Sequence, residues 1–333
     1  MLNPHWSGPP ILLKSSEEVE RCRAAGAIVI EALHAARTLC VAGMTTREID
    51  RVISNVLAEH GATGLFRGYR QTDTPPFPAE ACISVNDEVV HGIPGERVLQ
   101  PCDLVSVDVG VRFEGYCGDS AVSFLVPPPK DATEEQRGIY LERAALIADT
   151  RELLDRAIAM IQPGRRWSEI GSWMQQTTMD LERDLVTEFV GHGIGRSLHE
   201  PPKVPCYWDG FVGQDFVLEP GMILAIEPML VIRDPSGWPP APVVTGSGLP
   251  HPRAGVHTAP DGWTIRTDSG AVACHEEYMV LIGESGPEVL TLGTPRTDYL
   301  ALAGGGSSGA SECGSHEIFS SPTPGDAARD QRF

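Results

Sequence analysis

Apolar side chains recur at steps of three and four residues along four stretches of the chain, a spacing that predicts helices with one buried side. The first stretch opens with Ser15 and Glu18 in a capping-box pattern, which would begin a helix there. Short runs rich in β-branched residues lie between these stretches and predict strands. The predicted helices span 15–40, 46–60, 134–161 and 168–183, and the predicted strands span 103–109, 120–126, 221–226 and 277–282. Mixed elements of this kind indicate an α+β protein.

The two halves of the chain repeat each other. Segments 98–108 and 217–227 both read Val-Leu-x-Pro followed by an apolar run that ends in a carboxylate, at a constant offset of 119 positions. Segments 43–49 and 164–170 repeat at an offset of 121 positions. This echo predicts a duplicated α+β unit with a pseudo-twofold axis, whose shared centre receives acids from both halves.

Composition marks off parts of the chain that suit no regular structure. Residues 304–333 hold 6 Gly, 6 Ser and 2 Pro with few large apolar side chains, so we expect a disordered tail. Residues 235–255 hold 6 Pro and 4 Gly, which predicts a long surface loop. We therefore expect a short N-terminal extension over 1–13 and one large domain over 14–303 that carries this insertion.

Charge and cysteine content restrict the possible partners and the cellular compartment of the protein. The 333 residues carry 45 acidic and 26 basic side chains, a net charge of −19, which argues against nucleic acid or an anionic membrane as partner. The eight cysteines form no C-x-x-C pair, so we expect reduced, mostly buried thiols. No signal peptide and no apolar run long enough to span a bilayer is present, and we expect a soluble, cytoplasmic monomer.

Carboxylates stand beside the most apolar predicted strands. Asp108 ends one run and Asp119 follows a turn-rich stretch, although a capping role for Asp119 and backbone hydrogen bonds for Asp108 are open alternatives. Glu227 ends a run so apolar that its charge calls for a cation or an arginine. Glu276 and Glu277 precede another strand, and alternation places only one of them on the inward face without saying which.

One histidine completes the candidate constellation. Glycines flank His192 on both sides and leave its imidazole accessible. Four carboxylates with one imidazole suit a pair of divalent cations such as Mn, Fe, Co or Zn better than soft metals. Two such cations can clamp a tetrahedral intermediate, which points to metal-assisted hydrolysis.

Five segments in this order make the chain resemble the type I methionine aminopeptidases, which have the pita-bread fold. The resemblance covers about residues 14–291 and is carried by 84–94, Asp108 with 118–119, 191–202, 226–229 and 261–264. It implies a duplicated α+β unit around a central antiparallel sheet. It also implies an aminopeptidase that removes the initiator methionine from nascent polypeptides when the second residue is small.

The resemblance also implies roles for individual residues. The implied ligands of two divalent metal ions are Asp108, Asp119, His192, Glu227 and Glu277, which favours Glu277 over its neighbour. Glu227 doubles as the acid and base, and His91 and His199 contact the substrate and steady the intermediate. Tyr69, Phe77 and Trp263 match positions that line the methionine pocket.

The chain departs from the family pattern at several of these points. The family has Gln, an aromatic residue, the ligand Glu and then His, whereas here His275 and Glu276 precede Glu277 and Tyr278 follows it. The extra acid Glu276 could alter metal affinity or act as an alternative ligand. Leu198 replaces an aromatic residue, and residues 71–76 and the 235–255 insertion would alter the rim.

Two other functions remain open from the sequence. X-Pro aminopeptidases and prolidases share the fold, but they usually carry a large N-terminal domain, and only about 14 residues precede the matched segment here. They also tend to have Thr-Arg after the second Asp, whereas Ser120 and Ala121 follow Asp119. A non-catalytic binding homologue would have lost ligands, and all five positions are filled.

Overall fold

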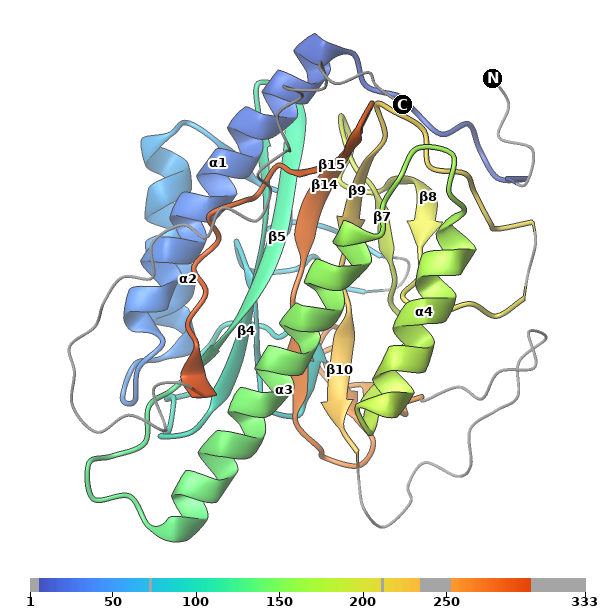
Figure 1. Ribbon diagram of the computed structural model, residues 1–333. Helices are drawn as coiled ribbons and strands as arrows, with labels where there is room; N and C mark the ends of the chain where they lie inside the picture. Colours follow the sequence, from blue (N-terminus) through green and yellow to red (C-terminus); the bar gives the residue numbers. More distant parts are fainter. Residues whose placement is uncertain (1–5, 72–73, 211–212, 234–252, 301–333) are drawn as a thin grey trace, which may run out of the picture.

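Four long helices lie along one face of the strands that form the middle of the molecule (Figure 1). The computed structural model describes residues 6–71, 74–210, 213–233 and 253–300. The helices are α1 (Ser16–Leu39), α2 (Thr46–Glu59), α3 (Glu134–Ala159) and α4 (Trp167–Asp180). The strands are β1 (Thr63–Gly64), β2 (Cys82–Val85), β3 (Glu88–Val90), β4 (Leu104–Phe113), β5 (Tyr116–Leu125), β6 (Arg183–Leu185), β7 (Gly191–Gly193), β8 (Glu200–Val204), β9 (Ile223–Ile226), β10 (Met229–Ile232), β11 (Val256–Thr258), β12 (Ile265–Thr267), β13 (Ala273–His275), β14 (Tyr278–Gly283) and β15 (Gly286–Val289).

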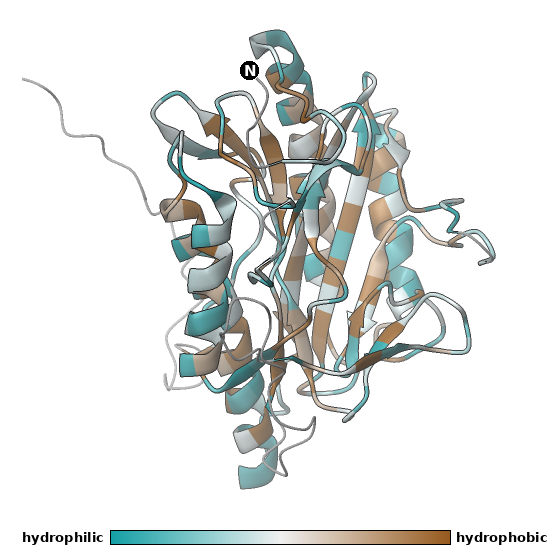
Figure 2. Ribbon diagram, turned by 90° about the vertical axis from the view of Figure 1, so that its right-hand side faces the viewer, coloured by the Kyte–Doolittle hydropathy of each residue, from teal (hydrophilic) through white to brown (hydrophobic). Residues whose placement is uncertain are grey.

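All four predicted helices are confirmed, with ends that shift by a few residues. Capping boxes begin three of them, at Ser15 for α1, Thr45 for α2 and Thr133 for α3. Each cap accepts a hydrogen bond from a backbone N–H that has no partner within the helix. The helices carry both apolar and polar residues in Figure 2, as expected of helices that bury only one side.

The central strands form two antiparallel sheets, one from each half of the chain. The first joins β1, β4 and β2, with β5 also paired to β4, and the second runs β15-β14-β9-β7-β8. Two smaller antiparallel sheets have the strand orders β13-β10-β6 and β11-β12-β3. The four predicted strands correspond to β4, β5, β9 and β14.

The predicted end of the first strand and the predicted turn after it are wrong. β4 continues past Asp108 to Phe113, and the turn consists only of Glu114 and Gly115, with φ of 47° and 82°. Two consecutive positive φ angles make the tight hairpin turn that matches strand twist. Tyr116 and Cys117, read as turn from their glycine neighbours, are instead buried in β5.

The duplication is visible in matching backbone contacts. Gly43 donates to the carbonyl of Leu99 at 2.9 Å, and Gly164 donates to the carbonyl of Leu218 at 2.8 Å. Bridges between Thr45 and Val98 and between Arg166 and Val217 repeat the same relationship. In Figure 1, α1 and α2 lie beside β4 and β5, while α3 and α4 lie on the side of β9 and β10.

Each helix pair covers its own apolar core. One core holds Leu33, Ile49 and Ile53 from α1 and α2 together with Val107 and Val122 of the first sheet. The other holds residues of α3 and α4 with strands of the second sheet, among them Leu146, Leu154, Ile170, Met174, Leu224 and Val280. Each of the two central sheets is therefore packed against its own pair of helices.

Several sequence expectations are settled by the described residues and others lie outside them. The seven described cysteines are free and buried, as predicted. Among these residues no helix has the length and apolar character of a membrane span. Most of the predicted 235–255 loop and the whole 304–333 tail lie outside the described residues. Of the 1–13 extension, Ser7 donates to the carbonyl of Gly213 at 3.1 Å.

Helix α1 approaches strand β5 so closely that only glycine fits between them. A Cβ on Gly118 would lie 2.6 Å from the backbone nitrogen of Gly26. We expect Gly118→Ala to lower the free energy of unfolding by about 1–3 kcal/mol through overpacking. Denaturant unfolding measures this.

Gly138→Ala is the matched control, because nothing lies within 4 Å of a Cβ at this exposed position of α3. It should raise the free energy of unfolding by about 0.5–1 kcal/mol, as expected for alanine in a helix interior. Equal effects of the two substitutions would contradict the close contact.

Candidate metal centre

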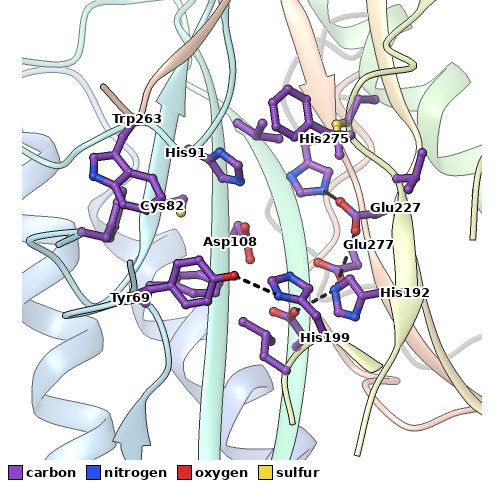
Figure 3. A pocket seen from close by; sticks show the side chains of 18 of the residues that line it. Tyr69, Cys82, His91, Asp108, His192, His199, Glu227, Trp263, His275 and Glu277 are labelled. Atoms are coloured by element: carbon purple, nitrogen blue, oxygen red, sulfur yellow. Dashed lines mark hydrogen bonds and ion pairs between the residues drawn. The ribbon is translucent and has the colours of Figure 1, made fainter. Parts of the chain in front are cut away.

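All ten site residues predicted from the sequence line one pocket. Figure 3 shows Tyr69, Trp263 and His91 on one side of it and Glu227, Glu277 and His192 on the other, with Asp108 between. The pocket thus has an aromatic wall and an acidic wall. The remaining lining residues are Phe66, Gln71, Cys82, Val90, Phe189, Val190, Leu198, Met229 and His275.

The β4-β5 hairpin brings two carboxylates to one face. Asp108 pairs with Ala121 and Asp119 pairs with Gly110 in the antiparallel register. Directly opposed residues share a face, and so do residues two apart on one strand. Asp108 and Asp119 therefore lie diagonally on the same face of the first sheet.

The second sheet supplies His192 and Glu227. His192 of β7 pairs with Ala225 of β9, and Glu227 follows the end of β9. A Cβ on Gly191 would collide with the carbonyl oxygen of Ala225, and one on Gly193 with that of Pro201. The glycines around His192 thus allow the backbones to approach each other closely.

Alternation separates Glu277 from Glu276. Glu277 lines the pocket, and its backbone N–H donates to Ala121 at 2.9 Å. Glu276 accepts hydrogen bonds from Arg151 Nε and from the backbone N–H of Ser123, both at 3.0 Å, and does not line the pocket. The idea that Glu276 is an alternative ligand is therefore wrong, because its carboxylate is already held by Arg151.

Three side chains form the tightest group. One ligand atom from each of Asp119, His192 and Glu277 lies within 4.8 Å of the others, close enough to hold a metal ion. His192 Nε2 lies 3.7 Å from Asp119 Oδ2 and 3.9 Å from Glu227 Oε1. Asp108 lines the same pocket but lies outside the tight group.

The acids repel one another in this buried setting. Burial raises the pKa of Asp108 to about 7. Burial and the neighbouring carboxylates raise the pKa of Asp119 and of Glu277 well above the ordinary value. Burial acts the same way on Glu227, but His275 and the other nearby histidines lower its pKa below the usual range. The pocket consequently favours a cation.

Unpartnered polar atoms support the fit to a metal. Among the described residues, Asp108 Oδ1, Asp119 Oδ1, Glu277 Oε1 and His275 Nε2 are buried without a hydrogen-bond partner. Buried polar atoms are normally paired, so such a cluster needs an explanation. Oxygen donors with imidazole nitrogen suit Mn, Fe, Co or Zn, and a divalent cation would satisfy these atoms.

The aromatic wall lies next to two further histidines. Phe77 and Trp263 pack edge to face with ring centroids 5.4 Å apart, and Tyr69 packs on Trp263 at 6.2 Å. The Tyr69 hydroxyl lies 3.4 Å from His199 Nδ1. Burial lowers the pKa of both His91 and His199 to about 4, so each ring is neutral at pH 7 and offers one N–H.

His275 is a residue of the pocket lining that the sequence did not place in the site. It was noted only as a departure from the family, yet its side chain lines the pocket. The signal was present, because residues two apart in an extended strand point to the same face, and His275 is two residues before Glu277.

Comparison with known proteins gives the class first. The model of metallopeptidase family M24 matches residues 20–284. The fold and the acidic pocket therefore define a metallopeptidase, a hydrolase of a family whose members depend on divalent metals.

Individual relatives show to which family of metallopeptidases the chain belongs. The methionine aminopeptidase of Clostridium acetobutylicum is 35% identical over 283 residues, which are 85% of this chain and 99% of the relative. The crystal structure of the methionine aminopeptidase from Thermotoga maritima matches with a TM-score of 0.71 and 34% identity, over 85% of this chain and 99% of that one. The chain belongs to the methionine aminopeptidase family, and the pita-bread fold is confirmed.

More distant structures share the fold alone. Aminopeptidase P from Escherichia coli matches 88% of this chain and 60% of its own length, with a TM-score of 0.57 and 20% identity. The X-Pro enzymes are therefore similar in architecture, at a lower identity than the methionine aminopeptidases.

The ion pair of Arg151 and Glu276 anchors the strand that precedes Glu277. Arg151 also donates to the carbonyls of Ser123 at 2.8 Å and Thr297 at 2.9 Å. We expect Arg151→Met to lower the free energy of unfolding by about 3–5 kcal/mol, because the Glu276 charge is left buried without a partner. Urea titration at pH 7 provides the measurement.

Arg156→Met is the control, because Arg156 pairs with Glu152 at the surface, where the side chains are 60% and 68% exposed. It should leave stability nearly unchanged. An Arg151→Met protein as stable as this control would show that the buried pair does not anchor the strand.

Proposed function

We propose that this chain is a dinuclear metal-dependent aminopeptidase that removes N-terminal methionine from nascent polypeptides when the second residue is small. The observation that supports it most is the buried group of acids and His192, with unpartnered oxygens, at the acidic wall of a pocket whose other wall is aromatic. The similarity to methionine aminopeptidases along most of the chain supports the same activity.

The proposed ligands of the two metal ions are Asp108, Asp119, His192, Glu227 and Glu277. Co, Mn, Fe or Zn would each suit this donor set. Bound divalent cations supply Lewis-acid activation of water and of the scissile carbonyl. The protein supplies the positions of the donors, which come from both halves of the duplicated fold.

The aromatic wall would bind the methionine side chain. Tyr69, Phe77 and Trp263 offer an apolar surface with edge-to-face ring contacts. Leu198 lies in the same lining and is smaller than the aromatic residue of the family pattern. The acidic wall opposite would attract the positively charged α-amino group of the substrate.

The catalytic side chains have complementary states. Glu227 stays ionised because the nearby histidines lower its pKa, so it can take a proton from the attacking water and pass it to the leaving amine. His91 and His199 are neutral and can each donate one hydrogen bond to the peptide. The Tyr69 hydroxyl would orient His199 through its Nδ1 atom.

The cellular setting is part of the proposal. The seven cysteines of the described residues are free and buried, which suits a reducing compartment, and the acidic sequence has no run of basic residues for nucleic acid or membrane. We place the protein in the cytoplasm as a monomer, where nascent chain N-termini are available.

Cleavage of a defined peptide tests the activity. Metal-loaded protein should release methionine from Met-Ala-Ser, and Asp108→Ala should lower kcat/KM more than about 100-fold because a metal donor is lost. Chromatography of the released methionine gives the rate. Asp131→Ala, on an exposed loop, is the control with unchanged activity.

The assay includes an Ala-Pro peptide under the same metals. Cleavage of Ala-Pro while Met-Ala-Ser stays intact would reject the methionine assignment and favour the X-Pro alternative. A protein with tight metal binding and no cleavage of either peptide would reject the peptidase proposal as stated.

Metal binding should stabilise the wild type more than a variant that lacks one proposed ligand. Cobalt or manganese should raise the Tm of the wild type with the logarithm of concentration, since ions bind only the folded state. At pH 8, Asp119→Asn should raise the metal-free Tm, because the fold raises the pKa of Asp119 and so disfavours its charged form. Its Tm should respond little to metal, and an unchanged metal response would exclude Asp119 as a ligand.

A further inference from the structure

His275 ends strand β13 and points into the metal centre from outside the five-residue ligand set (Figure 3). His275 is 2% exposed, and its side chain lines the pocket. Serine hydroxyls hold its backbone: Ser106 Oγ accepts from the N–H at 3.3 Å, and Ser123 Oγ donates to the carbonyl at 2.9 Å. The imidazole is therefore directed by a fixed strand, as a ligand needs to be.

The Nε2 atom of this ring faces Glu227. It is buried, and it lies in ion-pair contact with Glu227 Oε2 at 3.4 Å, which is longer than a strong hydrogen bond. Two donors that bind one tetrahedral ion at about 2.1 Å lie about 3.4 Å from each other. The separation of Nε2 and Oε2 therefore matches the one expected for two donors that share a cation.

Glu227 lies between two imidazoles. Its Oε1 atom faces His192 Nε2 at 3.9 Å, and its Oε2 atom faces His275 Nε2 at 3.4 Å. His192 also belongs to the tight group with Asp119 and Glu277, whereas His275 approaches from the opposite side of the Glu227 carboxylate. The two oxygens of Glu227 therefore face two places, each with its own nitrogen donor.

We infer that His275 is a sixth protein ligand, which binds through Nε2 a divalent cation that it shares with Glu227. This inference rests on the proposed metallopeptidase function and extends it. The family pattern usually has a glutamine at this place, and a glutamine could offer only its amide oxygen, which is a harder donor than an imidazole nitrogen. Imidazole favours Zn, Fe and Co, and carboxylate-rich sites favour Mn, so His275 should shift the metal preference away from Mn.

The alternative is that His275 only orients Glu227 through a hydrogen bond. A positioning role would alter the affinity for all metals by the same factor, since Glu227 would bind each of them less well. A ligand role alters the affinity for nitrogen-seeking metals selectively. The ratio of zinc to manganese affinity therefore separates the two roles.

The experiment measures dissociation constants for zinc and manganese by chelator competition on the full-length protein, with no assay of activity. His275→Gln should weaken zinc binding at the weaker of the two sites by about 10-fold or more and leave manganese binding within about 3-fold. Cobalt titration should show a changed visible absorption for the bound ion. His275→Ala, which removes any donor, should weaken zinc binding at least as much.

Controls keep the result interpretable. His257→Gln alters a half-exposed ring that pairs with Asp268, away from the pocket lining, and should match the wild type. The metal-free Tm of each variant reports folding. Equal weakening of zinc and manganese, or wild-type zinc affinity and cobalt absorption in His275→Gln, would overturn the ligand role alone. A wild type that binds no divalent cation would overturn the proposed function as well.

Discussion

The structure depends on one electrostatic constraint, the burial of several carboxylates at a single point with too little positive charge among the side chains. Asp108, Asp119 and Glu277 all have raised pKa values because burial and mutual repulsion disfavour their charged forms. A fold that holds such a group in place must obtain its rigidity elsewhere. It does so in two apolar cores, each under its own pair of helices, which flank the acids without contributing charge.

The acids meet at a seam between the two halves. Glu277 N–H donates to Ala121 of β5 at 2.9 Å, and the Ser120 hydroxyl donates to the Glu277 carbonyl at 2.6 Å. These bonds tie the second sheet to the first beside Asp119. The duplication thus explains the site, because each half brings carboxylates to the same place. Asp108 and Asp119 lie in β4 and β5 of the first half, and Glu227 follows β9 of the second.

The sequence predicted the helices for physical reasons that are local, and the residues that it proposed for the site line one pocket. Capping boxes and three-to-four spacing depend on neighbours along the chain, as at Ser15 and Glu18. The length of β4 and the true turn at Glu114 were missed, because glycines near Tyr116 resemble turn residues and only pairing across the hairpin shows that they lie in a strand. Partners that are distant in the sequence, such as Arg151 and Glu276, cannot be predicted from a local pattern.

The segment from His275 to Glu277 links strand β13 to strand β14, and its successive side chains face opposite sides. His275 and Glu277 face the pocket, while Glu276 between them turns away to Arg151 of α3. The carboxylate of the extra acid therefore lies outside the pocket lining, where it forms an ion pair with Arg151. The two departures from the family pattern are therefore neighbours with separate contacts: Glu276 pairs with Arg151 of α3, and the His275 imidazole lines the pocket.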